Sequence, residues 1–251
     1  MSVPAPRAGS ASGRVALVTG AAVRVGRAIA LELARAGADV AVHYRSSAAE
    51  AAQTAGEIRA MGRRAVELPA ELSDPEQCRE LVRAAAAALG GLDYLVHSAA
   101  SFDRVSLEDT DEAVWDAALG LNARAGLLLA REASQWLRRR QGRVVLLSDA
   151  LARQPVRGYL AHGVSKAAVE GLVRALALEL APEVSVNGIA PGTVLVPEGT
   201  PAEQAARWAK RLPLQRLGSA EDVARTAAFL CTGPAYVTGQ ILAVDGGQSL
   251  V

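Results

Sequence analysis

Short apolar segments recur along the chain from residue 14 onward, and longer segments rich in alanine and leucine separate them. Short apolar segments bounded by turn residues are typical of buried strands, and the longer segments between them are typical of helices. The predicted strands are Val15–Thr19, Asp39–Tyr44, Ala65–Leu68, Tyr94–His97, Val144–Ser148, Val184–Ile189 and Ile241–Val244.

Start signals support the helices between these strands. In Ser73-Asp74-Pro75, for example, a capping side chain precedes a proline, which is favoured in the first turn of a helix. Strands that alternate with helices predict a parallel sheet that is covered on both faces. Because no repeat or linker divides the chain, we expect one doubly wound α/β domain with a seven-stranded parallel sheet. Its ligand should lie beyond the carboxyl ends of the strands.

The composition sets the domain boundaries and excludes several function classes. Hydrophobic residues make up 51% of the 251 residues, enough for one large core. Residues 1–13 are rich in Ala, Ser, Pro and Gly and lack the apolar run of a signal peptide, so they predict a disordered tail before a domain at 14–251. The net charge of +1 and the scattered basic residues predict no binding to nucleic acid or membranes.

The two cysteines indicate a reducing compartment. Cys78 and Cys231 fall in different predicted helices and have no metal-ligand spacing. We therefore expect two buried free thiols, no metal site and a cytoplasmic protein.

A turn with two glycines follows the first predicted strand. Its sequence, Thr19-Gly-Ala-Ala-Val-Arg-Val-Gly26, leads into an amphipathic helix. Gly20 permits a tight turn and Gly26 permits close helix packing, while the free N–H groups of the helix can bind a diphosphate. The position of this turn predicts a dinucleotide site, with a purely structural turn as the alternative.

The end of the second predicted strand indicates which dinucleotide binds. A chain that prefers NAD places an acidic residue here to hold the ribose 2′-hydroxyl. This chain instead has His43-Tyr44-Arg45-Ser46-Ser47. A guanidinium and two hydroxyl groups suit a 2′-phosphate, and Arg24 in the glycine turn can add a second cation. The sequence therefore predicts NADP(H) rather than NAD(H).

Lysine is rare in this chain, which makes one lysine informative. Of the 27 Lys and Arg residues, only Lys166 and Lys210 are lysines. A compact ammonium makes point contacts and perturbs the protonation of a neighbour in a way that arginine does not. Lys166 lies at the start of a long apolar helix, and His162 lies one turn before it on the same face. We expect the chemistry of the protein at this pair.

These residues, together with Val237-Thr-Gly239 and Asp245-Gly-Gly247, resemble the short-chain dehydrogenase/reductase superfamily over residues 14–250. Arg24 in place of the middle glycine, His43-Tyr44-Arg45-Ser46 and Ala100-Ser101-Phe102 are most similar to its pteridine reductase branch. The resemblance implies a Rossmann-type fold, homotetramers or homodimers, and NADPH-dependent reduction of a pterin, folate or related carbonyl or imine.

The resemblance also implies the catalytic residues. Asn122 matches the Asn that anchors a proton-relay water, and Lys166 matches the Lys that binds the nicotinamide ribose and acidifies a tyrosine. Asp149 falls where the superfamily has Ser, and where the pteridine reductase branch has an Asp that supports proton donation. His162 stands in place of the tyrosine that acts as the acid.

Further residues are assigned to cofactor and substrate in the same way. Phe102 matches the aromatic residue that stacks a pterin, and the counterpart of Tyr159 lies at the pocket wall. His97 replaces a structural Asn, and Glu71 replaces an adenine-side Asp. The residues expected at the cofactor are Gly20, Arg24, Val25, Gly26, Tyr44, Arg45, Ser46, Glu71, Leu72, Ala99, Lys166, Pro191 and Gly192.

The mechanism depends on whether His162 can do the work of a tyrosine. Its far nitrogen falls about 2 Å short of a phenolic oxygen on the same backbone, so a bridging water is expected. A neighbouring ammonium opposes protonation of the imidazole, so His162 should be mostly uncharged near neutrality and still able to donate one N–H.

Three interpretations stay open. Asp149 supplies the proton with help from His162, because burial can keep a carboxyl group protonated. Alternatively, Tyr159, three residues before His162, is the acid. In the third interpretation activity is lost, and the protein is an NADP(H)-binding sensor or scaffold that works through a partner. We expect an NADP-dependent short-chain reductase that acts on a small molecule, with the non-catalytic binder as the alternative.

Overall fold

Seven parallel strands form one sheet in the part of the chain that the structure, a computed structural model, describes, which is residues 10–196 and 199–251. The strands are β1 (Val15–Thr19), β2 (Asp39–Tyr44), β3 (Ala65–Pro69), β4 (Tyr94–His97), β5 (Arg143–Leu147), β6 (Ser185–Pro191) and β7 (Ile241–Val244). Their order across the sheet is β3-β2-β1-β4-β5-β6-β7. This order is that of a doubly wound Rossmann-type domain, so the predicted fold class is confirmed.

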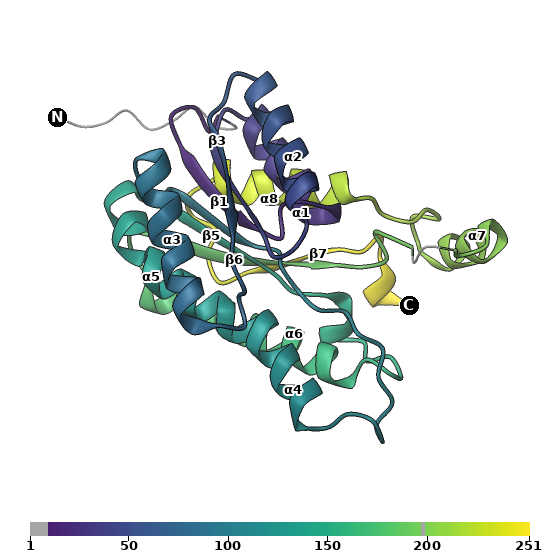
Figure 1. Ribbon diagram of the computed structural model, residues 1–251. Helices are drawn as coiled ribbons and strands as arrows, with labels where there is room; N and C mark the ends of the chain where they lie inside the picture. Colours follow the sequence, from purple (N-terminus) through teal and green to yellow (C-terminus); the bar gives the residue numbers. More distant parts are fainter. Residues whose placement is uncertain (1–9, 197–198) are drawn as a thin grey trace.

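Helices connect the strands and cover both faces of the sheet (Figure 1). The helices are α1 (Arg24–Arg35), α2 (Ala48–Ala60), α3 (Pro75–Leu89), α4 (Glu112–Leu119), α5 (Ala125–Arg140), α6 (Leu160–Glu179), α7 (Ala202–Arg211) and α8 (Ala220–Thr232). A π-helical turn, Gly120–Arg124, joins α4 to α5. At the start of α3, Asp74 accepts a hydrogen bond from the Glu76 amide, as the start signal predicted.

The sheet separates two apolar layers. Ala16 and Val18 of β1 pack into the layer formed with α1, α2 and α8, whereas Val15 and Leu17 pack into the layer formed with α3, α5 and α6. Successive side chains of a strand point to opposite faces, so a central strand must be apolar at every position. The continuous apolar segments of the sequence follow from this two-sided burial.

The amino-terminal boundary lies earlier than the sequence predicts. Residues 1–9 of the predicted tail lie outside the described residues. Ala11, however, is fully buried, and its N–H donates a hydrogen bond to the carbonyl of Ala36 just beyond α1. The packed domain therefore includes Ala11, although the sequence places this residue in the disordered tail.

Both cysteines are buried and free, as predicted. Burial raises the pKa of Cys78 to about 11 and that of Cys231 to about 12, so both thiols stay protonated near neutrality. Among the described residues, no helix is long and apolar enough to cross a membrane, and no cluster of His, Cys, Asp and Glu could hold a metal ion.

Helix α7 projects away from the sheet beside the carboxyl terminus of the chain (Figure 1). None of the residues of α7 is buried.

Candidate functional site

The predicted site residues gather at one edge of the sheet. Because the strands are parallel, their carboxyl ends meet at this edge, where doubly wound folds bind their ligands. The residues that end or directly follow β1 to β6 include Gly20, Tyr44, Arg45, Ser46, Ala99, Asp149, Pro191 and Gly192.

The turn between β1 and α1 is built on two glycines. Gly20 has a φ of +65°, and a Cβ at this position would lie 3.0 Å from the Cα of Ala99. A Cβ at Gly26 would lie 2.1 Å from the carbonyl oxygen of Gly20. Side chains are therefore excluded at both positions, and the backbone of the turn can approach a ligand closely.

Arg24 begins α1 in a backbone conformation that favours glycine. Its φ is 55°, which costs about 1–2 kcal/mol for a residue with a Cβ. The N–H groups of Arg24, Val25 and Gly26 belong to the first turn of α1, where a helix offers no acceptor for them. Together with the positive end of the helix dipole, these groups form a site that suits a diphosphate.

Arg45 is an exposed cation beyond the end of β2. Its Nη1 atom lies 3.9 Å from Oε2 of Glu71, and the two side chains are 68% and 39% exposed. The hydrogen bond from the Ser73 amide lowers the pKa of Glu71, so this carboxyl group stays ionised. An exposed pair of this kind is weak, which leaves Arg45 available to a phosphate.

Most of the other residues predicted to contact the cofactor are buried or offer only backbone or small side chains at the carboxyl ends of the strands. Tyr44 packs against the core and Leu72 is 2% exposed. The Ala99 amide donates to the hydroxyl of Thr19. Pro191 is buried, and a Cβ at Gly192 would lie 2.7 Å from the Cβ of Asp245. Ser46 is exposed beside Arg45.

Lys166 is buried on the inner face of α6. Its ammonium donates a 2.7 Å hydrogen bond to the carbonyl of Leu147, the last residue of β5. Burial lowers the pKa of Lys166 to about 8, and the charge of Asp149 opposes this shift. The ammonium is therefore mostly charged at neutral pH and held at the end of β5, beside the residue pair Ser148-Asp149.

Asn122 lies in the π-helical turn between α4 and α5, and π-helical turns often mark functional positions. Its Oδ1 accepts a hydrogen bond from the Ser101 amide, and its Nδ2 donates to the hydroxyl of Ser165. The Ser165 hydroxyl donates in turn to the carbonyl of His162, one turn earlier in α6. Asn122 is thus tied through Ser165 to His162.

His162 and Asp149 face each other across the site. Nε2 of His162 lies 3.6 Å from Oδ2 of Asp149, while Nδ1 lies 2.8 Å from the carbonyl oxygen of Ser101. The His162 side chain is 4% exposed, and its Nε2 is buried without a hydrogen-bond partner in the described structure. Asp149 caps the 3-10 turn Ala150–Ala152 through a hydrogen bond from the Leu151 amide.

These contacts determine the tautomer of His162. A carbonyl oxygen only accepts hydrogen bonds, so Nδ1 must carry the proton that is donated to Ser101. In the neutral ring, Nε2 is then an acceptor that faces Asp149. The one N–H that neutral His162 is expected to donate is therefore used at the Ser101 carbonyl.

Two aromatic rings lie next to His162. The Phe102 ring is 4.7 Å from the Tyr159 ring and 4.7 Å, edge to face, from the His162 ring. Phe102 is 54% exposed, so much of its surface is open to a ligand. Tyr159 is the N-cap residue of α6 and precedes the helix, so it does not share a helical face with His162.

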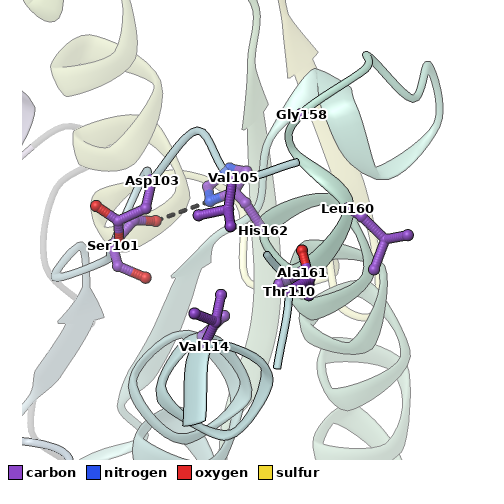
Figure 2. Close-up of a pocket in the computed structure, with 10 residues that line it drawn as sticks. Ser101, Asp103, Val105, Thr110, Val114, Gly158, Leu160, Ala161 and His162 are labelled. Carbon is purple, nitrogen blue, oxygen red and sulfur yellow. Dashed lines mark hydrogen bonds between the residues drawn. The ribbon is translucent and has the colours of Figure 1, made fainter. Parts of the chain in front are cut away.

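A small cavity lies against His162. Figure 2 shows the hydrogen bond from His162 to Ser101 at this cavity, with Val105 and Val114 nearby. The cavity volume is about 20 Å³, which is room for one water molecule. This cavity is therefore too small for a substrate.

The family model described as Enoyl-(Acyl carrier protein) reductase matches residues 20–249. A short-chain type dehydrogenase/reductase from Picea abies is 36% identical over 94% of this chain and 92% of its own length. The chain belongs to the short-chain dehydrogenase/reductase superfamily.

Other members of the superfamily are similarly close. The 3-oxoacyl-(acyl-carrier-protein) reductase FabG of Staphylococcus aureus is 33% identical over 93% of this chain and 97% of its own. A short-chain dehydrogenase from Burkholderia cenocepacia in complex with NADP has a TM-score of 0.88 at 38% identity, covering 94% of this chain and 98% of its own. A blue fluorescent protein from a metagenomic library in complex with NADPH has a TM-score of 0.88 at 34% identity, covering 95% and 98%.

Sequence reasoning missed several residues that hold this short-chain dehydrogenase/reductase site together. Ser101 and Ser165 orient His162 and Asn122, and His43 contacts the glycine turn. Only Ser165 carried a local signal, because a serine three residues after His162 can bond back to its carbonyl within the helix. The contacts of Ser101 and His43 join segments far apart in the sequence.

Proposed function

We propose that this short-chain dehydrogenase/reductase is an NADPH-dependent reductase in which Asp149 and His162 together replace the tyrosine acid. The observation that carries the proposal is the buried Nε2 of His162, which has no hydrogen-bond partner in the described structure and faces Asp149 at 3.6 Å. A buried polar atom without a partner is costly unless a neighbour can satisfy it. At 3.6 Å the two atoms are not hydrogen-bonded, and a small approach of Oδ2 to Nε2 would let one shared proton satisfy both groups.

The cofactor of this reductase is NADP(H). The first-turn amides of α1 suit the diphosphate, and the exposed Arg45 with Arg24 suits the 2′-phosphate. Two of the solved structures with the same fold contain NADP and NADPH. The bound nicotinamide supplies a hydride, so residues of this chain must hold the cofactor and supply the proton.

In the proposed pair, Asp149 is the residue that gives the proton to the substrate. Its side chain is 25% exposed, whereas that of His162 is 4% exposed. The proton therefore leaves Asp149 for the oxygen or nitrogen of the group that is reduced, and solvent returns it afterwards. The hydrogen bond from Nδ1 to Ser101 keeps Nε2 pointed at the carboxyl group, as the partner of a ring nitrogen fixes the role of the other nitrogen.

The substrate is a flat pterin-like ring or a related carbonyl or imine compound. The exposed Phe102 ring lies beside His162, the partner of the proposed proton donor, and aromatic rings bind flat heterocycles by offset stacking. Relatives named for 3-oxoacyl and aldehyde reduction make ordinary carbonyl compounds the competing substrates. Homo-oligomerisation and a cytoplasmic location remain predictions from the resemblance and the composition.

The competing function is that of an NADP(H)-binding sensor or scaffold without catalysis. It is favoured by one observation: the single N–H of neutral His162 is already donated to Ser101. Without a proton from Asp149, the site would bind the cofactor and not turn it over.

Oxidation of NADPH by the purified protein tests these functions. Dihydrobiopterin, dihydrofolate and a panel of aldehydes and ketones serve as substrates, and thermal stabilisation by NADPH reports cofactor binding. Turnover supports the reductase, and a preference for the first two substrates supports the pterin class. Stabilisation without turnover overturns the reductase in favour of the sensor, and no stabilisation overturns both.

A further inference from the structure

His43 contacts the dinucleotide turn with both its side chain and its backbone. It lies in β2 next to β1 and is 2% exposed. Its Nδ1 lies 3.0 Å from the Gly20 amide nitrogen, and its carbonyl oxygen lies 2.9 Å from the Ala21 amide nitrogen. Its Nε2 lies 3.1 Å from the carbonyl oxygen of Ala70, next to β3. One histidine thus joins the turn after β1 to the loop after β3.

The partners of His43 allow only one protonation state. The Gly20 amide can only donate, so Nδ1 must be unprotonated, and the Ala70 carbonyl can only accept, so Nε2 must carry the proton. An imidazolium would place two N–H groups against each other at Gly20. In agreement with this geometry, burial lowers the pKa of His43 to about 4, although the Ala70 hydrogen bond and the Glu71 charge oppose the shift.

Gly20 is the residue around which the turn is built. Its carbonyl oxygen lies against the backbone of Gly26, and its Cα lies against Ala99. A rotation of the Gly20 peptide would therefore move the first turn of α1. His43 opposes this rotation from the β2 side, and Thr19, which accepts hydrogen bonds from the Ser98 and Ala99 amides, holds the β4 side.

We propose that His43 is a positioning residue for the cofactor: its unprotonated Nδ1 holds the Gly20 amide so that the first-turn N–H groups of α1 face the diphosphate. This inference rests on the proposed NADP(H) site and adds a residue to it. The imidazole does not touch the cofactor. It affects cofactor affinity only by fixing the orientation of the Gly20 peptide.

Two substitutions test the hydrogen bonds of the two imidazole nitrogens separately. In His43→Asn, the amide oxygen lies close to the position of Nδ1 and can accept from Gly20, whereas the bond to Ala70 is lost. In His43→Gln, the longer amide can donate to Ala70, whereas the Gly20 amide loses its acceptor. Each variant removes one buried hydrogen bond, so a purely structural histidine would make both lose similar stability and similar affinity.

Dissociation constants of NADPH and of adenosine 2′-monophosphate, measured by calorimetry, test the proposal. Because the loss of one hydrogen bond corresponds to about tenfold in affinity, His43→Gln should bind NADPH about tenfold more weakly than wild type, and His43→Asn within about threefold. Adenosine 2′-monophosphate, which lacks the diphosphate, should bind both variants as it binds wild type. Equal NADPH affinity in wild type and His43→Gln overturns the inference.

The test also covers a wild type that binds no NADPH and variants that do not fold. If wild type itself binds no NADPH, the proposed cofactor site is wrong, and the inference about His43 is overturned with it. If either variant does not fold, nitrogen NMR of the wild-type imidazole replaces the comparison. An unprotonated Nδ1 that is hydrogen-bonded to the Gly20 amide supports the proposal, and a protonated Nδ1 overturns it.

Discussion

Nε2 of His162 lies 3.6 Å from Oδ2 of Asp149, while Nδ1 of the same ring is held by the Ser101 carbonyl. The imidazole therefore presents only one nitrogen to the site, and that nitrogen faces a carboxyl group. A tyrosine acid needs no such partner, because its hydroxyl carries its own proton. Under the proposed mechanism, the proton is therefore donated by the pair and not by His162 alone.

Replacing Asp149 with Asn tests this division of roles. The Asn side chain has nearly the same shape and keeps an oxygen for the Leu151 amide, but it cannot release a proton. We expect kcat to fall on the order of 10²-fold to 10⁴-fold, the usual contribution of a general acid, with NADPH affinity unchanged. Asp103→Asn, at the edge of the small cavity, is the matched control and should retain wild-type kcat. Wild-type kcat in Asp149→Asn would contradict the proposed mechanism.

His162→Tyr distinguishes a working histidine from a disabled site. The phenol cannot donate to Ser101 as Nδ1 does, and the cavity of about 20 Å³ beside the ring leaves little room for it. If His162 has its own role, the variant should lose on the order of 10²-fold in kcat. A silent wild type whose His162→Tyr variant becomes active would instead mark the site as a disabled version of the family machinery. Steady-state rates with NADPH and the best substrate decide between these results.

Arg45 is expected to determine the preference for NADP(H). Within residues 10–196 and 199–251, its guanidinium has only the distant Glu71 carboxylate as an ion-pair partner, so Arg45→Ala removes a cation without leaving a buried charge. Loss of a charge-assisted contact should weaken NADPH binding about tenfold or more and leave NADH binding unchanged. Arg35→Ala removes an exposed arginine at the other end of α1 and should change neither affinity. An equal loss for NADPH and NADH would show that Arg45 does not recognise the 2′-phosphate.

The strands and the cofactor turn could be predicted because their signals are local. Each predicted strand agrees with the structure to within two residues at either end, since continuous burial requires continuous apolar sequence. The burial of Lys166 and His162 on one face of α6 could also be predicted, because the two residues are four apart in one helix. The hydrogen bond from His43 to Gly20 could not, because the register between β1 and β2 appears in no local pattern.

The hydrogen-bond partners of His162 could not be predicted from the sequence for a similar reason. The carbonyl that fixes its tautomer comes from Ser101, in the loop after β4, and backbone carbonyl direction depends on loop conformation. The π-helical turn that carries Asn122 interrupts a segment that reads as a continuous helix. The residue types of the site are therefore visible in the sequence, whereas their hydrogen-bond roles are not.

Acid should unfold the protein partly through two buried histidines. Burial lowers the pKa of His43 to about 4, and burial with the Lys166 ammonium lowers that of His97 to about 3. Below the ordinary histidine pKa of about 6.5, the unfolded chain binds protons that the folded chain does not, so stability falls as the pH falls.

The expected slope is about 1.4 kcal/mol per pH unit for each of these histidines between about pH 6 and pH 4. Urea unfolding at a series of pH values measures it. His97→Asn should lose about half of the slope, because one of the two groups no longer titrates. A wild-type stability that is flat across this range would contradict the lowered pKa values of His43 and His97.

Lys166 carries a stability cost near neutral pH that should be relieved at alkaline pH. Burial lowers its pKa from 10.5 to about 8, so the charged folded state is disfavoured on the order of 3 kcal/mol relative to the unfolded chain. Above pH 8 the folded protein releases this proton while the unfolded chain keeps it, so wild type gains stability up to about pH 10.5. The free energy of unfolding of wild type, relative to Lys166→Met, should therefore rise by roughly this amount between pH 7 and pH 10. Lys210→Met, which alters an exposed lysine on α7, should show no such change. Parallel curves for wild type and Lys166→Met would mean that the ammonium is solvated and not held at Leu147.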